Sequence, residues 1–440
     1  MIVNHTQVTN NLMKHQGTFA EVHNPSYVFP AIEYYPLAPP LKHVNELKVA
    51  LMDMDGTTTT TEVLCIHSLE MMLRKMSGKM SRDDWQGVDH DKDLQHIIGN
   101  STTKHVEYLL IKYKDLICEM HAFESFIQAA AETLKHGQDE TRKDEVTQNI
   151  RKLGLKGILN DIHSGTGVDK LITKYRKHAG EIAFAMLVNI GIDIYYATYH
   201  HILGQLKAGE SDAVRKEVSG FSGLTGKLIA PMPGIPLMIP LVKGWLGNEA
   251  AHFGEQLIED YQQKTERSVN NEHKPLIIKK LAILGEYFER SPAKVGLVTS
   301  SIAYEADIVI REVIKDMADT ITNSPLSSVR KEHILHAYED YHRVYDAFVT
   351  ASDSSEIRLK PHRDLYSIAL HRTGLSPADF DKVLGFEDSQ SGTIAIRAAG
   401  IGCCIAVPFA QTASHNLEAA THILPGGIPE AIIDHSLFIR

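Results

Sequence analysis

The chain has few of the features that mark disulfide-rich or nucleic-acid-binding proteins. Its 440 residues include only four cysteines: Cys65 and Cys118 stand alone, while Cys403 and Cys404 are adjacent and would point to opposite faces of a strand. Because these four do not make a disulfide framework, we expect reduced thiols in a cytoplasmic protein. The formal net charge is −10 and no long basic run occurs, which argues against nucleic acid as the main partner.

Long apolar runs are also missing. Since a membrane span needs about 18 or more consecutive apolar residues, no transmembrane helix is expected. The first residues, MIVNHTQVTNNLMKHQGTF, contain no apolar h-region, so no signal peptide is expected either. Hydrophobic residues at 43% and charged residues at 23% are the composition of an ordinary globular protein, and the length suggests two or three domains.

Strand and helix patterns divide the chain into a core and an inserted helical region. The apolar run LKVALMD (47–53) predicts a central parallel strand, and alternating strand and helix patterns resume after Arg290. Repeated β-α units predict an α/β fold with a doubly wound, Rossmann-like parallel sheet. Between these parts, apolar residues spaced by three and four predict a large, mainly helical cap inserted after the first strand.

The expected boundaries follow from these patterns. Residues 1–45, polar and then rich in proline and aromatics, are expected to lie as an arm on the surface of a domain. The core is expected over 46–61 and 273–440, and the cap over 62–272. Within the cap, LIAPMPGIPLMIPLVKGWLG (228–247) contains four prolines, so it is expected to be an apolar loop or hairpin rather than one continuous helix.

Polar side chains stand where four predicted strands or their loops end. They are Asp53 and Asp55; Thr299, Ser300 and Ser301; Lys360; and Glu387 and Asp388. Each group alone has an ordinary explanation, such as a turn, a helix cap or a solvated lysine. Doubly wound sheets bind ligands beyond the carboxyl ends of their strands, so the four groups together favour one site.

This set of side chains suits phosphoryl transfer. Carboxylate oxygens of Asp53 and Asp388 and a backbone carbonyl near Asp55 suit Mg²⁺, a hard ion that keeps water ligands for a phosphate. A carboxylate can attack phosphorus and form an aspartyl-phosphate. Thr299 and Lys360 supply hydrogen-bond donors and positive charge to the transferring group. Asp55 can protonate the leaving alcohol and later deprotonate water.

Four stretches resemble the motifs of the haloacid dehalogenase superfamily, in the subgroup whose helical cap follows the first strand. They are MDMDGT, LVTSS, RLKPHRDLY and GFEDSQSGTIAIRAAGI, and the resemblance covers roughly 46–62 and 273–430. This subgroup includes phosphoglycolate-type phosphatases and β-phosphoglucomutase. The cap predicted here is longer than the compact cap of that group, so about 135–270 is expected to be an added helical module.

The resemblance also implies a role for each side chain. Asp53 would be the nucleophile and Asp55 the acid/base, while Thr299 and Lys360 would hold the phosphate. The implied metal ligands are Asp53, Asp55, Asp388 and Glu387. Further phosphate or substrate contacts are expected from Gly56, Thr57 and Ser300, and, in the cap loop IIGNSTTKHVEYLL (97–110), from Asn100 and Ser101.

The sequence therefore predicts a Mg²⁺-dependent phosphatase that acts on a small phosphorylated metabolite, as a monomer or homodimer. A β-phosphoglucomutase-like sugar phosphomutase is the alternative within the enzymes. A binding or scaffolding module with a vestigial core is the alternative from another class, and the presence of every motif residue argues against it. A dehalogenase or a phosphonate hydrolase is disfavoured, because those enzymes lack the second aspartate.

Overall fold

The structure is a computed structural model, and it describes residues 4–14, 17–24, 28–89, 92–93, 97, 102–222, 227–409 and 412–440. Contacts between residues divide the chain into two compact units. Met1–Thr60 and Ala230–Arg440 make up one, here called the sheet unit, and Thr61–Ile229 the other, here called the helical unit. None of the described helices is both long and apolar enough to cross a bilayer.

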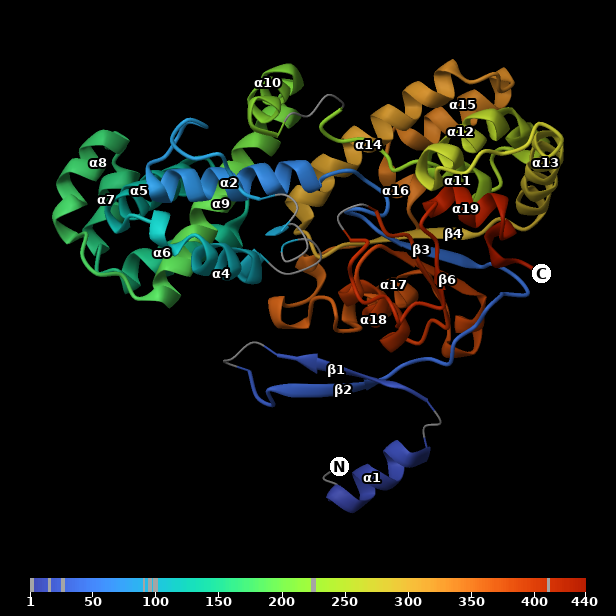
Figure 1. The fold of residues 1–440 in the computed structure, drawn as a ribbon, viewed down its shortest axis with the longest axis horizontal. Helices are drawn as coiled ribbons and strands as arrows, with labels where there is room; N and C mark the ends of the chain where they lie inside the picture. Colours follow the sequence, from blue (N-terminus) through green and yellow to red (C-terminus); the bar gives the residue numbers. More distant parts are fainter. Residues whose placement is uncertain are drawn as a thin grey trace. The chain divides into compact units, whose positions relative to one another are not determined.

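A six-stranded, wholly parallel sheet forms the centre of the sheet unit (Figure 1). Its strands are β3 (Val49–Asp53), β4 (Lys294–Val298), β5 (Ala347–Val349), β6 (Val383–Glu387), β7 (Cys403–Ala406) and β8 (His422–Ile423). Their spatial order is β5-β4-β3-β6-β7-β8, which is the doubly wound order. This order confirms the predicted α/β fold class. β3 lies between β4 and β6 with all five residues buried, which explains its unbroken apolar sequence.

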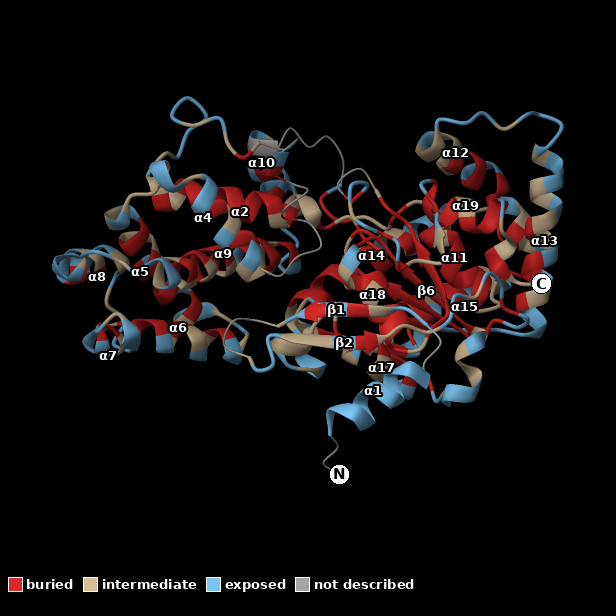
Figure 2. Cartoon of the chain, turned by 60° about the horizontal axis from the view of Figure 1, so that its bottom comes forward, coloured by how far each residue is buried: buried red, intermediate tan, exposed pale blue. Residues whose placement is uncertain are grey.

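Helices alternate with these strands along the chain and complete the sheet unit. They are α1 (His5–Lys14), α11 (Ile235–Val242), α12 (Gly254–Thr265), α13 (Lys274–Arg290), α14 (Ala303–Asn323), α15 (Ser328–Tyr338), α16 (Tyr341–Val344), α17 (Asp364–Arg372), α18 (Gln390–Ala398) and α19 (Gly427–Ile433). Short 3-10 turns lie at η3 (Gly247–Phe253), η4 (Ala351–Asp353), η5 (Glu356–Arg358), η6 (Pro377–Lys382) and η7 (Ser436–Phe438). Figure 2 shows that the strands at the centre of this unit are buried throughout.

The boundary between the units differs from the predicted one. The sequence predicts a cap over 62–272, whereas residues 230–272 belong by their contacts to the sheet unit. In this part, the proline-rich stretch contains the helix α11 instead of the expected loop or hairpin. Pro236 lies in the first turn of α11, where a missing N–H costs little. Burial of nearly all of the apolar side chains of α11 outweighs the one hydrogen bond that Pro240 removes.

The predicted N-terminal arm contains an ordered hairpin. β1 (Phe19–His23) and β2 (Ile32–Pro36) pair antiparallel, and the preceding helix α1 buries none of its residues (Figure 2). Three hairpin side chains, Ala20, Val22 and Tyr35, form a small buried cluster with Ala398 of α18. The hairpin therefore packs against a helix that follows the central strand β6.

The helical unit contains helices and no strand among its described residues. Its helices are α2 (Glu62–Ser77), α4 (Thr102–Lys112), α5 (Glu119–His136), α6 (Glu140–Lys152), α7 (Lys156–His163), α8 (Val168–Tyr175), α9 (Phe184–Lys207) and α10 (Ser211–Ser222), with short 3-10 turns at Lys114–Leu116 and Arg176–His178. α2, α5 and α9 pack on one another. The unit also buries a charged pair, because Asp193 of α9 accepts hydrogen bonds from Arg142 at 2.5 Å and Asn149 at 2.7 Å.

Candidate active site

The carboxyl ends of neighbouring strands bring the predicted residues together. Asp53 is the last residue of β3, Thr299 directly follows β4, and Glu387 is the last residue of β6. Since β4 and β6 pair with β3 on its two sides in parallel register, these three positions lie at one edge of the sheet. Lys360 reaches the same edge from the loop between η5 and α17.

Lys360 joins the ends of three strands. Its ammonium group donates to the Asp53 carboxylate, to Glu387 Oε1 at 2.7 Å and to the carbonyl oxygen of Val298 at 3.1 Å. The side chain is only 6% exposed. A buried ammonium group needs this degree of pairing, because its charge is costly to remove from water.

Glu387 is surrounded by hydrogen-bond donors. Oε1 accepts from Lys360 and from the Tyr366 hydroxyl, at 2.7 and 3.2 Å. Oε2 accepts from the backbone N–H groups of Asp388 and Ser389 and from the Ser389 hydroxyl, at 3.1, 3.2 and 2.9 Å. Gly392 makes this possible, since a Cβ there would lie 1.7 Å from Glu387 Oε1. These five donors occupy the acceptor capacity of the carboxylate.

Burial and mutual charge shift the pKa values at this edge. Burial, with the nearby charge of Glu387, raises the pKa of Asp53 well above its ordinary 3.8, and Lys360 opposes that rise. Burial alone would lower the pKa of Lys360, but the Asp53 and Glu387 carboxylates raise it above its ordinary value. Burial also raises the pKa of Tyr366, so this phenol stays protonated and donates to Glu387.

The turn after β3 holds Asp55 beside two hydroxyl groups. Oδ2 of Asp55 accepts from Thr299 Oγ1 at 3.4 Å and from Ser301 Oγ at 3.2 Å. The turn is closed by Gly56, whose N–H donates to Thr59 O at 2.9 Å. Asp55 is partly exposed, whereas Asp53 is buried, so the two aspartates meet different surroundings.

Three carboxylates meet the geometric requirement for a metal ion. One oxygen from each of Asp53, Glu387 and Asp388 lies within 4.8 Å of the other two, and Thr57 Oγ1 lies 3.5 Å from Asp388 Oδ1. A set of carboxylate oxygens suits Mg²⁺. Because Glu387 already accepts from five donors, its carboxylate has little capacity left for a metal ion.

Two residues near this edge were not predicted as site residues from the sequence, and Ser301 was included in a strand-end group without a role of its own. The first, Tyr366, is the last residue of the motif RLKPHRDLY. The second, Lys264 of α12, could not be predicted, because it is distant in sequence from all four motifs. Its half-buried ammonium group interacts with the charges of Asp260 and Asp388, and burial lowers its pKa.

The position of Lys264 follows from α12 and the segment that precedes α11. Met232 N donates to Thr58 O at 2.9 Å, and Gly234 N donates to Asp260 Oδ2 at 3.2 Å, so this segment connects α12 to the turn that carries Asp55. Among the residues that the structure describes, none forms a hydrogen bond or close ion pair with Lys264. It is therefore a second cation near the predicted metal ligands.

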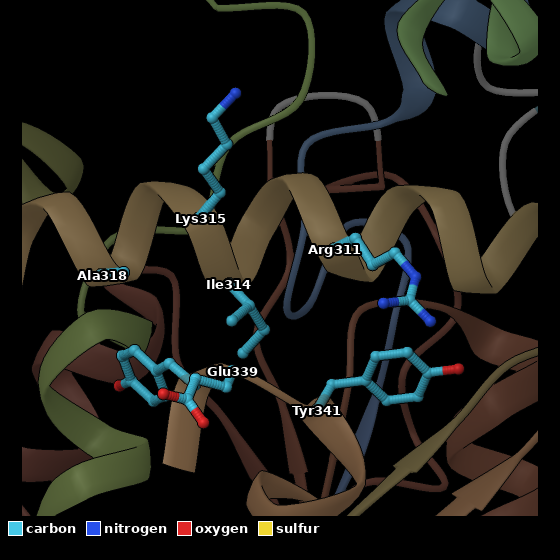
Figure 3. A pocket seen from close by; sticks show the side chains of 7 residues that line it. Arg311, Ile314, Lys315, Ala318, Glu339 and Tyr341 are labelled. Carbon is cyan, nitrogen blue, oxygen red and sulfur yellow. The ribbon is translucent and has the colours of Figure 1, made fainter. Parts of the chain in front are cut away.

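Other predicted residues stand apart from this network. Ser300 is exposed and remains a predicted phosphate contact, while Asn100 and Ser101 lie outside the described residues. A recess of about 210 Å³ occurs elsewhere in the sheet unit (Figure 3). It is lined by Arg311, Ile314, Lys315, Ala318, Tyr338, Glu339 and Tyr341. None of the predicted site residues lines it, so it is not part of the candidate active site.

Comparison with known proteins finds a partial match to a phosphatase. "Putative phosphatase YhcW" of Bacillus subtilis (strain 168) is 39% identical over 80 residues, which are 18% of this chain and 34% of that protein. The match thus spans about a third of the length of the relative. It bears out the phosphatase resemblance drawn from the motifs. No family model matches the chain.

Comparison with solved structures finds matches of low identity. The crystal structure of CbbY from Rhodobacter sphaeroides in complex with phosphate is 14% identical, covers 88% of this chain and 99% of its own, and has a TM-score of 0.40. The structure of a "putative beta-phosphoglucomutase" from Thermotoga maritima is 15% identical, covers 90% and 100%, and has a TM-score of 0.36. At these values they add no argument about fold or activity.

Proposed function

We propose that this chain is a Mg²⁺-dependent phosphatase that hydrolyses a small phosphorylated metabolite through an aspartyl-phosphate on Asp53. The observation that carries the proposal is the bridge made by Lys360. It binds the predicted nucleophile Asp53 and the strand-end acid Glu387 at once, beside Asp388 and Thr57. A nucleophile, a cation and metal-binding carboxylates are the parts that phosphoryl transfer needs.

The first step would transfer the phosphoryl group to the enzyme. Oδ1 of Asp53 is held by Lys360, and among the described residues no donor is bonded to Oδ2. Oδ2 would attack phosphorus as the bond from phosphorus to the alcohol oxygen breaks. The departing oxygen would take a proton from Asp55 and leave as the hydroxyl group of the product alcohol.

The second step would return Asp53 to its starting state. Water attacks phosphorus, its proton passes to Asp55, and the bond between phosphorus and Asp53 breaks to release inorganic phosphate. The hydroxyl groups of Thr299 and Ser301 orient Asp55 for both proton transfers. Lys360 supplies positive charge to the transferring group in each step.

The carboxylates near Asp53 fit a magnesium ion. Asp53, Asp388 and the backbone carbonyl of Asp55 would hold it, and it would offset the repulsion between a carboxylate and a phosphate dianion. The hydrogen bonds of Glu387 instead favour a role as the anchor of Lys360. The cytoplasmic location and the monomeric or homodimeric state remain predictions.

Replacement of the nucleophile tests this proposal. Asp53→Asn is expected to abolish release of phosphate from p-nitrophenyl phosphate in Mg²⁺, with an unchanged circular-dichroism spectrum. The matched control is Asp381→Asn, an exposed aspartate outside the site, which should keep full activity. In the unchanged protein, mass spectrometry of acid-quenched samples should detect one added phosphoryl group on Asp53.

Three outcomes would overturn the proposal in different ways. Full activity of Asp53→Asn would exclude the aspartyl-phosphate mechanism. If the unchanged chain converts a sugar phosphate to an isomeric sugar phosphate with little free phosphate, it is a phosphomutase. Inactivity across a broad panel of phosphate esters would favour the binding or scaffolding alternative.

A further inference from the structure

The N-terminal hairpin contacts the loop that carries Lys360. Arg358 and His362 lie two residues before and two residues after Lys360, and both bind side chains of β2. This hairpin precedes the first strand of the sheet and belongs to none of the four motifs.

Arg358 joins the two ends of the loop to the hairpin. Its Nε and Nη2 donate to the two oxygens of Asp364, each at 2.9 Å, which closes the loop around Lys360 with a bidentate pair. Its Nη1 donates to Glu33 Oε2 at 3.2 Å and to the Tyr35 hydroxyl at 3.0 Å. One guanidinium group therefore ties both loop ends to β2.

Because Glu33 can only accept hydrogen bonds, the donors and acceptors among Tyr35, Glu33 and His362 can be assigned. The hydrogen bond from Tyr35 lowers the pKa of Glu33 to about 2, so Glu33 is a carboxylate that can only accept. Tyr35 has one proton and gives it to Glu33 Oε2 at 2.6 Å. His362 Nδ1, 2.8 Å from the Tyr35 oxygen, must therefore be the N–H that donates to it. The Tyr35 oxygen thus accepts from residues on both sides of Lys360.

The hairpin is also fixed to the helix that follows Asp388. Tyr35 is 8% exposed and packs in the cluster with Ala398 of α18. Just after β2, Ala38 N donates to Arg397 O at 2.9 Å, and Arg397 Nε donates back to Ala38 O at 3.0 Å. The hairpin therefore contacts both the Lys360 loop and α18, the helix that begins just after Glu387 and Asp388.

We propose that the β1–β2 hairpin is a positioning element for Lys360, in which Tyr35 and Glu33 hold the loop through Arg358 and His362. This inference rests on the proposed function for its effect on catalysis. It adds that the hairpin sets the position of the cation at the active site. Tyr35 and Glu33 touch neither substrate nor reacting atoms, and they act through Lys360.

The hairpin offers a matched pair of substitutions. Tyr35→Phe removes the hydroxyl that joins Glu33, Arg358 and His362. Tyr34→Phe removes the neighbouring hydroxyl, which is exposed and donates only to Glu21 Oε2, at 2.8 Å, within the hairpin. Tyr35→Phe is expected to lower kcat/KM about 10-fold, because small displacements of a catalytic group reduce rates steeply. Tyr34→Phe is expected to leave kcat/KM unchanged.

The rate of lysine labelling reports how well the Lys360 amine is held in the site, and it does not depend on catalytic activity. Reductive methylation followed by mass spectrometry is expected to leave Lys360 protected in the unchanged chain and in Tyr34→Phe. In Tyr35→Phe and in Glu33→Gln, labelling of Lys360 should accelerate several-fold. Labelling of Lys280, a half-buried lysine that donates to Ile433 O at 2.6 Å, should not change.

The two measurements separate failure of this inference from failure of the proposed function. Unchanged labelling of Lys360 in Tyr35→Phe would overturn the inference, as would equal acceleration at Lys360 and Lys280, which indicates general loosening. Selective acceleration at Lys360 in a chain that hydrolyses no phosphate ester would support the positioning role and refute the phosphatase. Selective acceleration with a loss of kcat/KM supports both.

Discussion

The Lys360 ammonium group donates to the Glu387 carboxylate at 2.7 Å, and both side chains are almost completely buried. The pair links the loop after β5 to the end of β6, and Lys360 also donates to the predicted nucleophile Asp53. Since a buried cation and a buried anion stabilise each other only while both are present, the pair makes the site sensitive to loss of either charge.

Glu387→Gln should therefore reduce both stability and activity. A glutamine places a donor NH₂ group at a position where the carboxylate accepts from five donors. It also leaves Lys360 with Asp53 as its one remaining carboxylate partner. The free energy of unfolding is expected to fall by about 3 kcal/mol, and kcat/KM by about 100-fold. Urea unfolding and steady-state hydrolysis of p-nitrophenyl phosphate measure the two effects.

The control for Glu387→Gln is a glutamate in an exposed ion pair. Glu46 lies 3.6 Å from Lys382 and is 50% exposed, so Glu46→Gln should change the free energy of unfolding by less than about 1 kcal/mol. If Glu387→Gln proved as stable and as active as the unchanged chain, the anchoring role of Glu387 would be wrong.

Asp55→Asn should separate the two chemical steps. Nitrophenolate leaves readily without a proton, so formation of the aspartyl-phosphate needs little help from Asp55, whereas attack by water needs a base. Stopped-flow absorbance is expected to show a burst of about one equivalent of nitrophenolate, followed by slow turnover. An alkyl phosphate, whose leaving alcohol requires protonation, should give no burst of released alcohol. A steady state without a burst on the aryl ester would exclude Asp55 as the base for hydrolysis.

The strand ends could be predicted from the sequence because they depend on short-range patterns. An unbroken apolar run ending in Asp53 predicts a buried central strand, and the same reasoning applies to Thr299 and Glu387. The parallel order of the sheet then follows from repeated β-α units. Both predictions, the strand ends and the parallel sheet, depend only on the spacing of apolar residues and on the residues that end each apolar run.

Contacts over long sequence separations could not be predicted in this way. Tyr35 and His362 are 327 residues apart, and nothing in IEYYP distinguishes the tyrosine that binds the loop from its exposed neighbour Tyr34. Lys264 lies close enough to feel the charge of Asp388 because α12 belongs to the sheet unit, although its helical pattern resembles that of the cap. The same similarity explains why the predicted boundary was placed at 272.

Lys264→Met should change metal and phosphate binding in opposite directions. A cation near Asp388 repels a divalent ion and attracts an anion, so its removal should strengthen Mn²⁺ binding and weaken phosphate binding, each by about 3- to 10-fold. Electron paramagnetic resonance of free Mn²⁺ measures the first, and calorimetry with inorganic phosphate measures the second.

Lys280→Met is the matched control for Lys264→Met, because Lys280 is a half-buried lysine of the same unit that donates to a backbone carbonyl. It should leave both affinities unchanged. Parallel weakening of Mn²⁺ and phosphate binding in Lys264→Met would show a structural role for Lys264 and contradict its electrostatic one.

The buried carboxylate of Asp193 should give the helical unit a distinct pH dependence. Burial raises the pKa of Asp193 from 3.8 to about 6, although Arg142 and Asn149 oppose the rise. Between pH about 4 and 6, the unfolded chain has released this proton while the folded chain still holds it. The contribution of Asp193 to the free energy of unfolding should therefore fall as pH rises through this window, by up to about 3 kcal/mol, and level off above about pH 6.

Urea unfolding followed by tryptophan fluorescence can isolate this effect. The chain has two tryptophans, Trp85 in the helical unit and Trp245 in the sheet unit, so a Trp245→Phe background reports on the helical unit alone. Subtracting the profile of Asp193→Asn leaves the contribution of Asp193. Because the folded state binds the proton more tightly than the unfolded state, this difference must decrease with rising pH. A difference that increased between pH about 4 and 6 would mean that the pair with Arg142 outweighs burial and holds the pKa of Asp193 below its ordinary value.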